Sequence, residues 1–72
     1  MNHLPKYIKA IGADLTALRA ILTTAIDDID HGLEAVGQGN QDGAVGSIMP
    51  VEHSLKQATT LVQAILILHR QN

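Results

Sequence analysis

Residues 15–29, LTALRAILTTAIDDI, carry apolar side chains at intervals of three and four positions, which is the repeat of an amphipathic α-helix. The same repeat extends from residue 4 to residue 36 and returns between residues 51 and 65. Its members are Leu4, Ile8, Ile11, Leu15, Leu18, Leu22, Ala25, Ile29 and Val36, and then Val51, Leu55, Ala58, Val62 and Ile65. The pattern predicts an all-α fold built from two long helices.

The segment between the two repeats is GQGNQDGAVG, residues 37–46, with four glycines in ten positions. Each glycine lowers helix propensity by about 1 kcal/mol, so this tract predicts a loop. Asn2 is suited to cap the first helix, and Pro5 is tolerated in a first helical turn. We therefore expect one domain over residues 1–72, an antiparallel helical hairpin with a helix at about 3–36, a Gly-rich loop at 37–46 and a helix at about 48–70.

The two expected helices differ in length, at roughly 50 Å and 33 Å for about 33 and 22 residues. Folding back at the loop would leave the start of the first helix uncovered. The apolar stripes are also wider than a single seam, here taken to contain the row Ile8, Leu15, Leu22 and Ile29 as well as Leu18 and Val62. We expect a second copy to cover the surplus, which gives a homodimeric four-helix bundle. The expected partner-binding residues are Leu4, Tyr7, Ile8 and Ile11 in the overhang, and Ile21, Leu61 and Leu68 beside the seam.

Composition excludes several classes of function. The chain has no cysteine, a single aromatic residue, Tyr7, and a formal net charge of −2. It therefore lacks thiolate ligands, a platform for stacking bases and a strongly basic surface. Its longest apolar run is too short to span a membrane, and its start lacks the pattern of a secretory signal. No nucleophile elbow or phosphate loop is present, so we expect a cytoplasmic protein that is not an enzyme and needs no cofactor.

The densest polar cluster is DDIDHGLE, residues 27–34. Asp27, Asp30, His31 and Glu34 share one helical face, which the assumed seam turns outward to solvent. A metal-binding bundle is the alternative, because reflection about the loop brings the second helix to the level of His31. Its ligands would be Asp28, His31, Glu34, Glu52 and His53. His69 falls on the expected inward row of the second helix, near the C-terminal end of that helix, where its imidazole would contact water or the last helical carbonyls.

Lys6 and Lys9 suggest a further alternative, a weak contact with nucleic acid or with a membrane surface, although lysines beside an apolar stripe more often form its rim. In pattern the chain resembles small dimeric hairpin bundles such as a plasmid-borne RNA-binding regulator. It shares no motif with that regulator and lacks the basic and aromatic residues of an RNA-binding face. The favoured interpretation is a non-catalytic assembly module, typical of a small bacterial accessory protein. It would bind itself, and another protein through a helix-in-groove contact.

Overall fold

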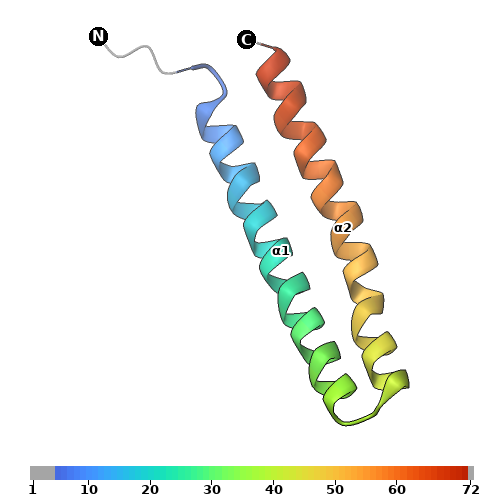
Figure 1. Cartoon of the computed structure of the whole chain (residues 1–72). Helices are drawn as coiled ribbons and strands as arrows, with labels where there is room; N and C mark the ends of the chain where they lie inside the picture. The colour runs from blue at the N-terminus through green and yellow to red at the C-terminus, as the bar shows by residue number, and fades with distance from the viewer. Residues whose placement is uncertain (1–4, 72) are drawn as a thin grey trace.

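A computed structural model describes residues 5–71 as two antiparallel helices (Figure 1). Helix α1 spans Ile8–Gly37 and helix α2 spans Gln41–Arg70, and no strand occurs within the described range. The hairpin is a rod of 60 × 20 × 10 Å with a radius of gyration of 17.0 Å. A compact domain of this length would have a radius of gyration of about 11 Å. The all-α hairpin predicted from the sequence is confirmed, and its shape is far from globular.

The connection between the helices consists of only three residues, Gln38, Gly39 and Asn40. Gly39 has a φ of 71°, the left-handed conformation that ends many helices and that glycine adopts without strain. The Asn40 N–H donates to the Ala35 carbonyl at 2.8 Å, and the Gly39 N–H donates to the Val36 carbonyl at 3.0 Å. These two bonds form a Schellman motif. Asn40 then caps α2, because its side-chain oxygen accepts a hydrogen bond of 2.9 Å from the Gly43 N–H.

The predicted loop at residues 37–46 is therefore wrong at its C-terminal side. Helix α2 begins at Gln41 rather than near residue 48, so Gly43, Gly46 and Pro50 all lie inside it. The Asn40 cap and the favourable position of Asp42 near the positive end of the helix dipole help to offset these poor helix formers. At the other end, α1 begins at Ile8, and the Pro5 carbonyl accepts a turn hydrogen bond from the Ile8 N–H at 3.2 Å. The expected Asn2 cap and the first two residues of the expected helix lie outside the described residues.

The predicted overhang of the first helix is also wrong. Each helix has 30 residues, and the short connection joins the end of α1 to the start of α2. The end of α2 therefore lies beside the start of α1, as Figure 1 shows.

The seam between the helices follows a heptad rhythm of alternating three- and four-residue steps. Its buried members are small: Ala25, Gly32 and Ala35 from α1, and Val51, Ser54 and Ala58 from α2. Its half-buried members are Ile11, Asp14, Leu18, Ile21 and Asp28 from α1, and Ala44, Ser47, Leu61, Ile65 and Leu68 from α2. A Cβ placed on Gly32 would lie 3.6 Å from the Ser47 Cβ, so the helices approach closely near the connection. Small side chains permit this approach.

The row expected to face inward does not lie in this seam. Ile8, Leu15, Leu22 and Ile29 follow one residue after seam positions and are exposed. Leu18 is a seam residue as predicted, whereas Val62 is 42% exposed and lies outside the seam. Both rows repeat every seven residues, and it is the row with the smaller side chains that α1 buries against α2.

Substitution by alanine is expected to have opposite effects on stability at Gly39 and at Gly46. A Cβ on Gly46 would meet nothing within 4 Å, so Gly46→Ala should stabilise the protein by about 0.5–1 kcal/mol through helix propensity. Gly39→Ala should destabilise it by about 1 kcal/mol, because alanine is strained at a φ of 71°. Urea unfolding of both variants measures the difference, and equal shifts in the same direction would contradict the assignment of the connection.

Candidate functional site

One side of the hairpin is lined by large apolar side chains. On each helix they occupy the positions that follow a seam residue by one. We call this surface the outer apolar face: Ile8, Leu15, Leu22, Ile26, Ile29, Leu33 and Val36 from α1, and Val45, Ile48, Leu55, Val62 and Leu66 from α2. Each of these side chains is between 39% and 64% exposed in the single chain. The face runs the length of the rod.

The two rows belong to the same side because the helices are antiparallel. Positions that follow the seam by one residue on both helices then flank the same edge of the interface. A shallow groove of about 280 Å³ near the connection shows this directly. Ile29, Leu33 and Val36 line one wall, Val45 and Ile48 line the other, and the seam residues Gly32 and Ala44 complete the lining.

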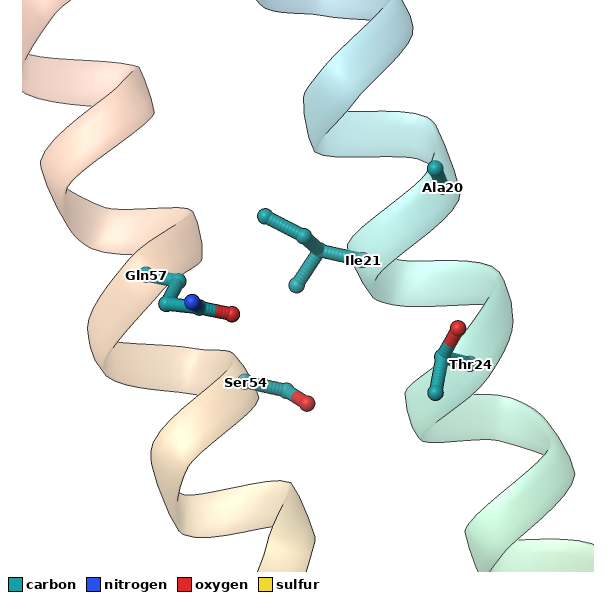
Figure 2. A pocket seen from close by; sticks show the side chains of 5 residues that line it. All are labelled: Ala20, Ile21, Thr24, Ser54 and Gln57. Carbon is teal, nitrogen blue, oxygen red and sulfur yellow. The ribbon is translucent and has the colours of Figure 1, made fainter.

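The opposite side of the hairpin has a different character. Positions that precede seam residues by one are mostly small or polar: Ala10, Ala13, Ala17, Ala20, Thr24, Asp27, His31 and Glu34, and then Gly43, Gly46, Pro50, His53, Gln57, Thr60, Ala64 and Ile67. Figure 2 shows part of this side, where Ile21, Ser54 and Gln57 point into the space between the helices and Ala20 and Thr24 lie beside it. We call this surface the polar face. Ile67 is its one large apolar residue within the described chain.

The hairpin buries little apolar surface by itself. Among the described residues no large side chain is fully buried, and the buried apolar residues are three alanines and one valine. The accessible surface is 5595 Å², whereas a compact monomer of 7.7 kDa exposes about 4,300 Å². The surplus of exposed surface exceeds the roughly 800 Å² that one partner buries in a typical protein interface.

The structure distributes the expected partner-binding residues over different environments. Ile8 lies on the outer apolar face, and Tyr7 is half-buried just before α1 begins. Ile11, Ile21, Leu61 and Leu68 are half-buried in the seam, so they contribute to the hairpin itself. Leu4 lies outside the described residues. The expected partner-binding residues do not include Ile26 and Leu66, which lie on the outer apolar face.

The expected metal ligands are not brought together. Asp28 is a half-buried seam residue, and His31, Glu34 and His53 lie exposed on the polar face. Glu52 follows the seam residue Val51 by one, so it lies on the opposite side, at the edge of the outer apolar face. Glu52 forms an exposed ion pair with Lys56 at 3.6 Å, a type of contact that contributes little stability. Within residues 5–71 no group of three or more histidine, aspartate or glutamate side chains is placed to hold a metal ion. The outward orientation predicted for Asp27, Asp30, His31 and Glu34 agrees with their exposure.

The remaining polar candidates are also exposed. The Lys6 ammonium lies 5.5 Å from the centre of the Tyr7 ring, a cation–π contact at the start of α1. Lys9 is exposed in the first turn of α1. His69, expected on the inward row of α2, is exposed instead, because it lies one residue beyond the seam residue Leu68.

Comparison with known proteins does not assign the chain to a family. No protein-family model, curated protein or solved structure matches the chain. In the described part of the chain, neither helix combines the length and the apolar character needed to cross a membrane. What the fold and the surface define is a two-helix hairpin with one apolar face and one polar face.

Proposed function

We propose that the protein is a non-catalytic assembly module, in which two copies pack their outer apolar faces together to form a homodimeric four-helix bundle. The observation that carries this proposal is the extent of the outer apolar face. It has twelve large aliphatic side chains, whereas the seam of the hairpin fully buries none. A soluble monomer rarely exposes so extended an apolar patch unless the patch is an interaction site.

The geometry of the helices supports the same proposal. On α1 the residues of the outer apolar face form a second row at about 100° around the helix from the seam. Its steps are seven residues from Ile8 to Leu22 and three or four residues from Leu22 to Val36. Two seams at about a right angle are what each helix needs to contact two neighbours in a four-helix bundle. The short connection leaves this face open on both helices at once.

Concentration dependence of thermal unfolding tests the proposal. If folding is coupled to dimerisation, the unfolding midpoint rises with protein concentration by mass action. We expect a rise of several degrees between about 5 and 500 μM, measured by circular dichroism at 222 nm. A cooperative transition at the same temperature across that range would contradict self-assembly. It would favour the alternative occupant of the same face, an amphipathic helix of another protein.

A further inference from the structure

The charged residues are segregated along the sequence. No lysine or arginine occurs between Arg19 and Lys56, whereas six of the seven acidic residues lie in that interval. They are Asp27, Asp28, Asp30, Glu34, Asp42 and Glu52. The five basic residues, Lys6, Lys9, Arg19, Lys56 and Arg70, lie outside it with Asp14.

Because the chain folds back on itself, this segregation gives the rod one acidic half and one basic half. The hairpin brings the start of α1 and the end of α2 together at one end of the molecule and leaves the connection at the other (Figure 1). The half that contains the connection is therefore acidic. The half that contains the start of α1 and the end of α2 is basic. Lys56 lies near the middle of the rod. Counting residues outward from the contact between Gly32 and Ser47 places it about level with Thr23. Each copy carries a charge dipole along its length.

Two copies related by a twofold axis can join their outer apolar faces in two ways. In a same-direction pair both connections lie at one end, and in an opposite-direction pair they lie at opposite ends. Neighbouring helices are antiparallel in both arrangements, so helix dipoles do not distinguish them. The side-chain charges do, because complementary potentials across an interface select the orientation of the partners.

The same-direction pair places α1 on α2 of the second copy. Lys9 and Arg70 then meet at the basic end, while the acidic residues of both copies gather around the two connections. The opposite-direction pair places α2 on α2 and brings Arg70 of each copy level with Asp42 of the other. These groups are exposed, so the preference is electrostatic and weakens with salt.

The outer apolar face fits the opposite-direction pair without an offset. Along α1 it runs from Ile8 to Val36, and Leu22 is its midpoint. A twofold axis perpendicular to the rod at Leu22 places Ile8 of one copy level with Val36 of the other. The apolar residues of the face on α1 then lie level with α1 of the other copy, and each basic half covers an acidic half.

We infer that the outer apolar face binds a second copy of this chain in the opposite direction, about a twofold axis near Leu22. This inference rests on the proposed self-assembly. It adds the orientation of the partners, which determines that the two connections and their acidic surroundings lie at opposite ends of the assembly.

Spin labels provide the test, because the chain has no cysteine and accepts a single label at any exposed site. The variant Gln38→Cys carries the label in the connection. The opposite-direction pair separates the two labels by about 45 Å, the length of a 30-residue helix. The same-direction pair separates them by about 10–20 Å, one or two interhelical distances. Double electron–electron resonance distinguishes these values.

The variant Thr23→Cys is the matched control, because it labels an exposed site near the midpoint of the rod. Face-to-face pairing in either direction gives a short distance, about 25 Å or less, for this site. A long Gln38 distance with a short Thr23 distance supports the inference. A short Gln38 distance in a dimer overturns the orientation alone, and long distances at both sites in a dimer overturn face-to-face packing in favour of end-to-end contact. A monomeric mass overturns the proposed assembly itself.

Discussion

Leu22→Asp is expected to abolish dimerisation and, at micromolar concentration, to unfold the protein. In the single chain Leu22 is 39% exposed at the middle of the outer apolar face. In the proposed assembly it lies at the twofold axis, so the variant would bury two carboxylates close together in apolar surroundings. The cost is at least about 3 kcal/mol, or roughly 100-fold in the dissociation constant. Sedimentation equilibrium and circular dichroism measure the loss of mass and of helix.

Thr23→Asp is the matched control for Leu22→Asp. It introduces the same charge one residue later, at an exposed position outside both the seam and the outer apolar face. We expect its effect on stability to stay within about 0.5 kcal/mol. If Leu22→Asp were as well folded and as well associated as Thr23→Asp, Leu22 would not lie in an interface.

Val51→Asp is expected to destroy the hairpin itself, whether or not it assembles. Val51 is 8% exposed in the single chain and has the largest side chain among the buried residues of the seam. A carboxylate at this position is covered by α1 and has no basic partner, because the nearby half of the rod contains none. The free energy of unfolding should fall by about 3 kcal/mol or more. For a small helical protein this loss is sufficient to remove most of the far-ultraviolet helical signal.

Two comparison variants separate charge from packing at this site. Val51→Ala removes only methyl groups and should cost less than the aspartate variant. Thr60→Asp places a carboxylate on the polar face of the same helix, where solvent remains available, and should leave the helical signal intact. A Val51→Asp protein with unchanged helix content would show that the seam is assigned to the wrong residues.

The sequence was sufficient to predict two helices but not the place where they join. Four glycines fall between residues 37 and 46, and this density of poor helix formers predicts a loop there. The decisive signal was shorter: Gly39 can adopt the left-handed conformation that ends α1, and Asn40 directly after it can cap α2. A helix stop and a helix start can thus share three residues, and the remaining glycines are carried inside α2.

The seam could not be predicted because α1 has two rows with the same repeat. The row through Ile8, Leu15 and Leu22 is the more apolar one, yet α1 buries the row through Ala25 and Gly32 against α2. Hydrophobicity ranks these rows in the wrong order, because the close approach of two helices depends on small side chains as well as on apolar ones. The width of the stripe was the more reliable signal. It indicated that two helices would leave apolar surface exposed, and twelve large side chains are exposed on one face.

The mass of the folded protein in solution tests the central claim most directly. Sedimentation equilibrium at about 10–100 μM should give about 15 kDa, twice the 7.7 kDa of the chain, together with a strong helical signal in the same sample. These are concentrations at which an interface of typical size and micromolar or tighter affinity is occupied. A helical, cooperatively folded species of 7.7 kDa would show that the hairpin is stable with its apolar face exposed to water, and would contradict the account.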